Sequence, residues 1–236
     1  MCTVTFVASA GKKILTSNRD EQTSRPSLEP DTYPINGKNL LFPKDPRAGG
    51  TWFASDEHAN VLVLLNGAFE AHHHQPPYRR SRGLIVLDLL ASVSAIAQWE
   101  AIDLDSVEPF TIVLYENGNL FELRWDGISK FRKDLDAGQN YIWSSTTLYP
   151  KQIRDRREKW FSDFLKQNPD PGADDLFRFH RYTESSDTQN GLIIDRVGIA
   201  LQTLSITQAA IDGRHVEFRH SDLIGKYISK TICTSA

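Results

Sequence analysis

The feature that most limits the possible folds of this chain is that its strand-like segments follow one another as hairpins. Residues 2–9 are strand-like, a turn follows at Gly11, and residues 13–20 form the return segment. A second pair, residues 109–116 and 120–126, is joined by an Asn-Gly turn, which is a strong hairpin signal. Parallel strands need long crossover connections instead. The sequence therefore predicts antiparallel sheets.

The hydrophobic pattern places the remaining elements. Further strands are expected at residues 50–55, 60–67, 141–146, 192–207 and 215–220, and helices at residues 82–92, 92–102, 151–168 and 174–182. Residues 22–50 contain many prolines, so a functional loop or short unplaced strands are expected there. The grouped order predicts an α+β fold in which two antiparallel sheets stack face to face with helices outside, as a single domain over residues 1–236.

Charge and cysteine content exclude several classes of function. The formal net charge of −3 provides no basic excess for a nucleic-acid partner. No apolar run reaches the ~18 residues of a membrane span. Cys2 and Cys233 are too few for a disulfide framework, so a cytoplasmic location is expected, and Cys233 falls in a C-terminal tail expected to be loosely held. Phosphate-binding glycine loops do not occur, no cofactor is expected, and the oligomeric state stays open.

Cys2 is the strongest candidate for a functional residue. Removal of Met1, which is usual before a small residue, would leave a thiol and a free α-amine on one carbon. An α-amine titrates near pH ~8, close enough to neutrality to accept the thiol proton. Cys2 would then be a nucleophile with its own base. The alternative is that Cys2 is a small buried residue that begins a strand.

The first hairpin is expected to return charged groups to Cys2. With the turn centred on Gly11, Cys2 faces Asp20 and Thr3 faces Arg19, with facing Cβ atoms ~5 Å apart. Asp20 would hold the α-amine, and Arg19 would favour the thiolate or bind an anionic substrate group. Adjacent residues of a regular strand point to opposite faces, so both act on one side only if a bulge interrupts residues 18–21.

Asn18 and Glu21 flank this pair and are expected to contact the substrate, and a register slip of one residue would bring Glu21 to Cys2. The alternative is an ordinary polar strand end. Asn66 ends a buried apolar strand, and its amide could donate to a tetrahedral oxyanion. An Asn-Gly turn explains Asn66 as well. His72–His74 have no acidic or Cys partner at useful spacing, so a mobile loop is expected there and no metal site.

Several motifs in sequence order resemble the NRDE family, also called the transport and Golgi organisation protein 2 family. They are Met-Cys at the start, Asn-Arg-Asp-Glu at 18–21, GGTWFA at 49–54, the strand ending in Asn66, SRG at 81–83, WSSTTLYP at 143–150 and TLSIT at 203–207. The resemblance covers essentially the whole chain. It implies the N-terminal-nucleophile hydrolase fold, a four-layer αββα sandwich, in the cysteine branch that includes penicillin V acylases, bile-salt hydrolases and acid ceramidase.

The resemblance also implies site residues. Cys2 matches the nucleophile, Arg19 and Asp20 match its hairpin partners, and Asn66 matches the oxyanion asparagine. The second asparagine of the acylases has no counterpart, and the segment around Ser144, Ser145 and Thr146 stands in its place. Arg196 is the candidate for a distal arginine.

The function expected from this resemblance is cleavage of a linear amide in a small-molecule amide or acyl substrate by the Cys2 thiolate. The family has also been discussed in haem and lipid handling. The alternative is therefore a non-catalytic protein that binds or carries haem or an acyl ligand in the same cavity.

Overall fold

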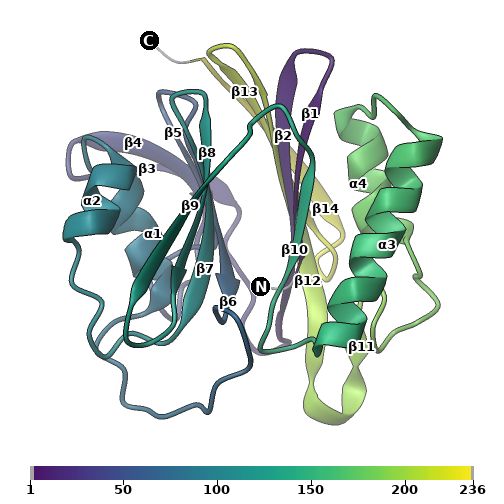
Figure 1. Ribbon diagram of the computed structural model, residues 1–236, viewed down its shortest axis with the longest axis horizontal. Helices are drawn as coiled ribbons and strands as arrows, with labels where there is room; N and C mark the ends of the chain where they lie inside the picture. The colour runs from purple at the N-terminus through teal and green to yellow at the C-terminus, as the bar shows by residue number, and fades with distance from the viewer. Residues whose placement is uncertain (1–2, 235–236) are drawn as a thin grey trace.

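Two antiparallel sheets lie face to face in the computed structural model, which describes residues 3–234 (Figure 1). Sheet A contains β1 (Thr3–Ser9), β2 (Lys12–Gln22), β10 (Tyr141–Ser144), β11 (Asp195–Arg196), β12 (Leu201–Asp212), β13 (His215–Asp222) and β14 (Tyr227–Thr234). Its order is β10-β1-β2-β12-β13-β14, with β11 paired to β12. Sheet B contains β3 (Pro30–Ile35), β4 (Lys38–Pro43), β5 (Phe53–Asp56), β6 (Val61–Asn66), β7 (Phe110–Glu116), β8 (Asn119–Trp125) and β9 (Lys130–Leu135), in chain order.

Helices cover the outer face of each sheet (Figure 1). The pair α1 (Arg82–Leu90) and α2 (Ala95–Ala101) packs on sheet B, and the pair α3 (Lys151–Gln167) and α4 (Ala173–Tyr182) packs on sheet A. The predicted α+β sandwich of two antiparallel sheets with outer helices is confirmed. Among residues 3–234, no helix is both long and apolar enough to cross a membrane.

Strand β1 shows how alternation in the sequence builds two cores. Val4 and Phe6 point toward sheet B and belong to the large core between the sheets. Val7 points the other way and packs with Phe161 of α3 and Phe179 of α4. Burial of each such side chain contributes about 1.5–3 kcal/mol. Strand β1 is therefore buried on both faces and fixes the position of the residues at its ends.

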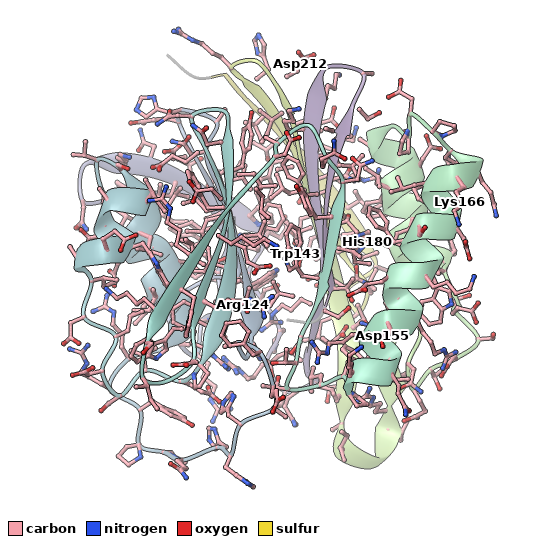
Figure 2. The ribbon with its side chains drawn as sticks, in the orientation of Figure 1. Arg124, Trp143, Asp155, Lys166, His180 and Asp212 are labelled. Carbon is pink, nitrogen blue, oxygen red and sulfur yellow. The ribbon has the colours of Figure 1, made fainter. Side chains whose placement is uncertain are left out.

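Two side chains labelled in Figure 2, Trp143 and His180, lie on opposite faces of sheet A. Trp143 of β10 lies between the sheets and donates its indole N–H to Glu122 of β8 at 2.5 Å. His180 of α4 lies on the helical side of sheet A, where its Nε2 is 2.8 Å from the Thr5 hydroxyl of β1. Polar contacts as well as apolar packing therefore hold adjacent layers together.

Residues 22–50 contain a hairpin whose strands the sequence analysis did not place. The turn between β3 and β4 is Asn36-Gly37, with φ of 48° and 82°, which suits a two-residue hairpin. Strand β3 is the edge of sheet B and includes Pro30 and Pro34. Proline is tolerated at an edge because its missing N–H removes no hydrogen bond from the sheet interior. The Asn-Gly pair was the usable signal, and the prolines masked it.

Two more edge strands, β9 and β14, were not predicted. Strand β9 has the sequence KFRKDL and is largely exposed, so it lacks the apolar alternation of an internal strand. The expectation of a loose C-terminal tail is wrong, because β14 pairs with β13 and places Cys233 opposite Val216. Pairing of the backbone, rather than apolar content, orders both segments.

The first hairpin is offset by one residue from its predicted register. Its turn is formed by Ala10 and Gly11, which both have positive φ, so Ser9 pairs with Lys12. Thr3 consequently pairs with Asn18 and not with Arg19. The prediction was wrong because it centred the turn on one residue instead of two.

Candidate functional site

The end of β1 that carries Thr3 is held on three sides. Thr3 is fully buried and pairs with Asn18 of β2 and Ser144 of β10. Its hydroxyl accepts a hydrogen bond of 2.6 Å from Arg157 Nη1 of α3. Cys2, the predicted nucleophile, lies outside the described residues. The residue that follows it in the chain is thus fixed by both neighbouring strands and by a helix.

Arg19 of β2 points toward sheet B. Its guanidinium stacks over the Trp52 ring at 4.4 Å and donates from Nη1 to the Arg25 carbonyl at 2.7 Å. The nearest carboxylate oxygen recorded for it is that of Asp45, 3.9 Å from Nη2. Arg19 is only 3% exposed. A buried guanidinium held in this way presents a fixed positive charge between the sheets.

Asp20 points the other way, toward α3. Its carboxylate accepts hydrogen bonds from the Tyr149 hydroxyl at 2.7 Å and the Thr203 hydroxyl at 2.5 Å. The Tyr149 ring is covered by the guanidinium of Arg157 at 3.6 Å and by that of Arg196 at 5.2 Å. The carboxylate therefore sits in a closed, oriented setting.

The irregularity in this part of sheet A lies on β12 and not at residues 18–21. Asp20 pairs with Thr203, whereas Arg19 pairs with Ser205, which leaves Leu204 as an extra residue on β12. Strand β2 itself stays regular, so Arg19 and Asp20 face opposite sides, as adjacent strand residues do. The bulge that would have brought both to one face is absent from β2.

A cavity of about 620 Å³ opens between β2, β6 and α1. It contains three of the predicted site residues, namely Arg19, Glu21 and Asn66. Its charged lining consists of the arginines Arg19, Arg25, Arg47, Arg80 and Arg82 and the carboxylates Glu21, Asp45 and Glu108. A cavity of this volume suits a small-molecule ligand.

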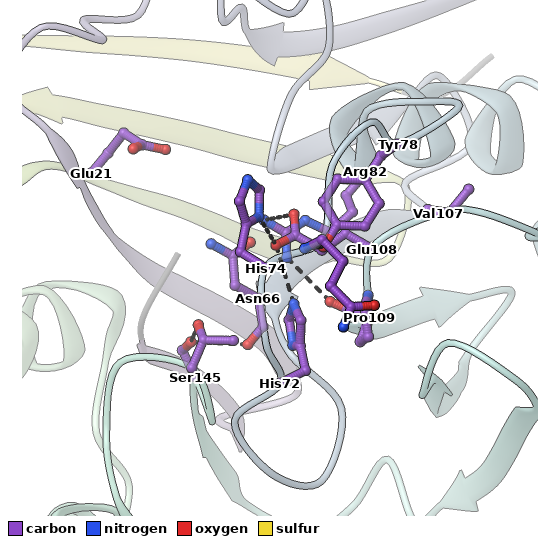
Figure 3. A network of polar contacts seen from close by, with 12 residues as sticks. Glu21, Asn66, His72, His74, Tyr78, Arg82, Val107, Glu108, Pro109 and Ser145 are labelled. Carbon is purple, nitrogen blue, oxygen red and sulfur yellow. Dashed lines mark hydrogen bonds and ion pairs between the residues drawn. The ribbon is translucent and has the colours of Figure 1, made fainter.

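Asn66 ends β6 at the wall of this cavity and is tied to sheet A through its backbone (Figure 3). The Ser145 hydroxyl donates to the Asn66 carbonyl at 2.9 Å. The next residue, Thr146, donates to the Glu70 carbonyl at 3.1 Å, and it lines a smaller cavity of about 70 Å³ that Asn66 shares. Gly67 has φ of 82°, and a Cβ there would lie 2.2 Å from the Thr146 hydroxyl. The structure thus brings Asn66, Ser145 and Thr146 together.

Asn18 and Arg196 lie on the helical side of sheet A and are not in the lining of the large cavity. The Asn18 side chain is fully buried and donates to the carbonyls of His180 and Leu192 at 3.2 and 2.6 Å. Arg196 donates to the Gln189 carbonyl at 2.8 and 2.9 Å. Internal carbonyls accept from the Asn18 amide and from Nε and Nη2 of Arg196, so the contact of these two residues with substrate stays a prediction.

The histidine segment is anchored to the rim of the cavity (Figure 3). His72 Nε2 and His74 Nδ1 lie 3.1 and 3.2 Å from the same Glu108 oxygen, and Arg82 Nη2 lies 2.9 Å from the other. Burial alone would raise the pKa of Glu108, but Arg82 and the two histidines outweigh it and hold the pKa below its usual value. No cluster that could hold a metal ion occurs among residues 3–234.

Sequence reasoning missed the residues that hold the predicted ones in place. Arg157 and Tyr149 orient the end of β1 and Asp20, and both are fully or almost fully buried. Arg157 lies in a strongly charged helix, where a charged residue is normally assigned to the exposed face. Tyr149 falls within the WSSTTLYP motif, which was the one available signal.

The chain resembles known proteins in structure more than in sequence. No curated protein sequence matches it significantly. Among solved structures, a conjugated bile acid hydrolase from Clostridium perfringens is similar, with a TM-score of 0.65, 9% identity, and coverage of 98% of this chain and 92% of that one. A Caenorhabditis elegans orthologue of N-acylethanolamine-hydrolyzing acid amidase has a TM-score of 0.63, 13% identity, and coverage of 90% and 93%.

These likenesses show that the chain has the fold of the N-terminal-nucleophile hydrolase superfamily. The family model described as Transport and Golgi organisation 2 matches residues 1–210. That match spans most of the 236 residues and includes every predicted site residue. The chain therefore belongs to the Transport and Golgi organisation 2 family.

Proposed function

We propose that this protein is an N-terminal cysteine amidohydrolase that cleaves a linear amide bond in a small molecule. The observation that carries the proposal is the link between the start of β1 and the end of β6. Thr3 pairs with Ser144, and the next residue, Ser145, donates to the Asn66 carbonyl. Cys2 directly precedes Thr3 in the chain. The proposed nucleophile and the proposed oxyanion donor thus belong to segments that are tied to each other.

The proposed reaction begins with removal of Met1, which frees the α-amine of Cys2. The amine takes the thiol proton, and the thiolate attacks the amide carbonyl. The Asn66 amide and a backbone N–H stabilise the resulting oxyanion. Collapse breaks the C–N bond, the α-ammonium returns its proton to the leaving amine, and a thioester on Cys2 remains. Water then attacks the thioester, releases the carboxylic acid and restores the thiol.

Arg19 and Asp20 have separate tasks in this proposal. Arg19 lines the cavity, so its positive charge favours the thiolate and attracts a negatively charged substrate. Asp20 is buried on the other face, where Tyr149 and Thr203 orient its carboxylate for a hydrogen bond to the α-ammonium. Separation of the two charges by the strand keeps the carboxylate from neutralising the guanidinium.

Two further observations support a small-molecule amide as the substrate class. The similar solved structures carry the names of a conjugated bile acid hydrolase and an N-acylethanolamine-hydrolyzing amidase. The cavity of about 620 Å³ falls within the usual range for small-molecule sites, ~300–1,000 Å³. We propose the same class of activity, amide hydrolysis, for this chain.

A hydrolysis assay on purified protein tests the proposal. Intact-mass measurement first establishes whether Met1 has been removed. Release of amine from a panel of linear acyl amides is then followed for the wild type, Cys2→Ala and Cys233→Ala. Loss of the nucleophile is expected to lower kcat/KM at least ~1,000-fold.

Cys233→Ala is the matched control, because Cys233 lies at the other end of sheet A. Cys233 pairs with Val216 of β13. Thr3 pairs with Asn18, which pairs with Ile206, and Ile206 in turn pairs with Ser221 of β13, five residues along that strand from Val216. The activity of Cys233→Ala is expected to equal that of the wild type. Wild-type activity in Cys2→Ala would overturn the catalytic assignment, and binding without turnover in every protein would indicate a carrier of haem or of an acyl ligand.

A further inference from the structure

Two segments that have no part in the proposed reaction, GTW at 50–52 and SRG at 81–83, form one wall of the large cavity. Their backbones touch, since a Cβ on Gly50 would lie 2.3 Å from the Gly83 carbonyl carbon. The Thr51 N–H also donates to the Gly83 carbonyl at 3.1 Å. Both positions need glycine for this close approach. The wall is therefore built by a specific local sequence.

This wall also contains the start of helix α1. Ser81 is the N-cap residue, and its side chain makes no capping hydrogen bond. The first turn carries no acidic residue. The N-terminal end of a helix has a partial positive charge and N–H groups without partners inside the helix. The partial positive charge at the start of α1 adds to the positive charge of the arginines around the cavity.

The cavity is positively charged in a chain that is negatively charged overall. Its lining has five arginines against three carboxylates, a difference of +2, whereas the whole chain has a formal net charge of −3. Arg25, Arg80 and Arg82 each form an ion pair at 3.1 Å or less. The Arg47 guanidinium has no hydrogen bond or ion pair recorded with residues 3–234 and lies exposed at the cavity.

Trp52 supplies an independent sign of a missing partner in the same wall. Its side chain is 97% buried, since only 3% is exposed, and it lines the cavity beside Arg19. The indole N–H is buried and finds no acceptor in the described part of the chain. Buried N–H donors of native proteins are nearly always paired, which makes this unpaired donor next to the cavity an unusual feature of the wall.

We infer that the cavity takes a substrate bearing an anionic group, a carboxylate or a phosphate, away from the amide bond that is cleaved. Arg47 and the wall at the start of α1 bind this group. The inference rests on the proposed hydrolase function and deepens it by naming the substrate class. A carboxylate or phosphate would meet guanidinium donors that match its geometry and would offset the surplus positive charge.

Binding to the Cys2→Ala protein tests the inference without requiring turnover. The three probes are N-octanoyl amides that differ only in their amine portion. The amines are 3-aminopropanoate, methyl 3-aminopropanoate and 3-aminopropyl phosphate. Titration calorimetry is expected to show at least roughly tenfold tighter binding of one or both anions than of the ester. This preference should shrink as the salt concentration rises, because salt screens an exposed charge. Tighter binding of one anion than of the other identifies the group.

Two arginine variants in the Cys2→Ala background localise the effect. Arg47→Gln should weaken binding of the preferred anion roughly fivefold to tenfold and leave binding of the ester unchanged. Arg79→Gln is the matched control, because Arg79 pairs with Asp103 and does not line the cavity. Equal affinity for all three probes, no binding of either anion at millimolar concentration, or equal losses in both variants would overturn the inference. Tight anion binding without hydrolysis by the wild type would contradict the hydrolase and leave the anion site standing.

Discussion

The two faces of strand β2 differ sharply at adjacent residues. On the face of Arg19, the side chains border an open cavity, and several arginines form ion pairs that solvent reaches. On the face of Asp20, the buried hydroxyls of Tyr149 and Thr203 donate to the Asp20 carboxylate, and the buried Arg157 guanidinium donates to the Thr3 hydroxyl. One face can exchange partners with a ligand, whereas the other cannot do so without disturbing the fold.

This difference assigns different work to the two faces. The open face offers charge and shape to a substrate, so changes there should alter affinity more than stability. The closed face sets the position of the end of β1 and of Asp20, so changes there should alter stability and reaction rate together. Substitutions on the two faces should therefore differ in their effect on stability, from a large loss on the closed face to almost none on the open face.

Arg157→Ala should cause the largest loss of stability. The guanidinium is fully buried and donates to the Thr3 hydroxyl and to the carbonyls of Asn190 and Gly191. Its removal leaves several buried acceptors unpaired and opens a cavity, so we expect a loss of about 3 kcal/mol or more in the free energy of unfolding. Urea denaturation measures the loss.

Arg156→Ala is the control on the same helix. Arg156 is 49% exposed at its side chain and lies 3.8 Å from Asp187, so its removal should cost no more than ~0.5 kcal/mol. Comparable losses in the two variants would show that the closed face does not depend on buried polar contacts.

Acid should destabilise the protein through His180. Burial, together with the nearby Arg157 charge, lowers the pKa of His180 to about 3 from an ordinary value of 6.5. The unfolded state therefore binds more protons between these two pH values, and stability falls as pH drops below 6.5. The expected slope approaches ~1.4 kcal/mol per pH unit, or about 2 kcal/mol lost by pH 5.

The slope can be measured by urea denaturation at pH 7 and pH 5 in wild type and His180→Gln. His220, whose burial lowers its pKa to about 4, adds a similar slope that the variant should retain. His58→Gln, at an exposed position, serves as control and should keep the full wild-type slope. An unchanged slope in His180→Gln would contradict the prediction.

Tyr149→Phe should separate positioning from simple packing. The change removes only the hydroxyl that donates to Asp20, so we expect a loss of about 1–2 kcal/mol in stability. Because Asp20 would then be less well oriented, acylation of Cys2 should also slow and its pH profile should shift. Stopped-flow acylation at several pH values gives both quantities.

The control for this prediction is Tyr141→Phe. That hydroxyl donates to the Asp136 carbonyl at 3.2 Å in an exposed setting, so stability and acylation rate should stay close to wild type. A Tyr149→Phe protein that loses stability but keeps the wild-type rate and pH profile would mean that Tyr149 supports the fold alone.

Arg47→Ala should have the smallest effect on stability. The side chain is exposed, and its guanidinium has no recorded hydrogen bond or ion pair with the described residues. The free energy of unfolding, measured by thermal denaturation, should therefore change by no more than ~0.5 kcal/mol. A large loss of stability here would show that the cavity face is part of the folding core, and the contrast between the two faces of β2 would fail.

The sequence predicted the layered architecture because its strong signals are local. Alternation, the Asn-Gly turns and the amphipathic helices each depend on residues that are close together in the chain. Edge strands β3, β9 and β14 escaped prediction because an edge strand needs backbone partners and little apolar content. The register of the first hairpin was missed by one residue, since the two positive-φ residues at Ala10 and Gly11 are not distinguishable from a one-residue turn in composition.

The candidate site was predictable to the extent that its residues lie in short motifs. Arg19, Glu21 and Asn66 were found from the sequence and do line one cavity. The buried support, Arg157 and Tyr149, comes from segments far away in the chain, and their burial depends on how α3 packs against sheet A. Such placement is a tertiary property that no local pattern reports.

Trapping of the acyl-enzyme tests directly whether Cys2 is the nucleophile. The protein is mixed with an activated octanoyl ester, quenched in acid, and measured by intact mass and peptide mapping. We expect a wild-type chain without Met1 that gains one octanoyl group on Cys2, no gain in Cys2→Ala, and a full gain in Cys233→Ala. A chain that retains Met1, or an acyl group found on another residue in the wild type, would contradict this assignment.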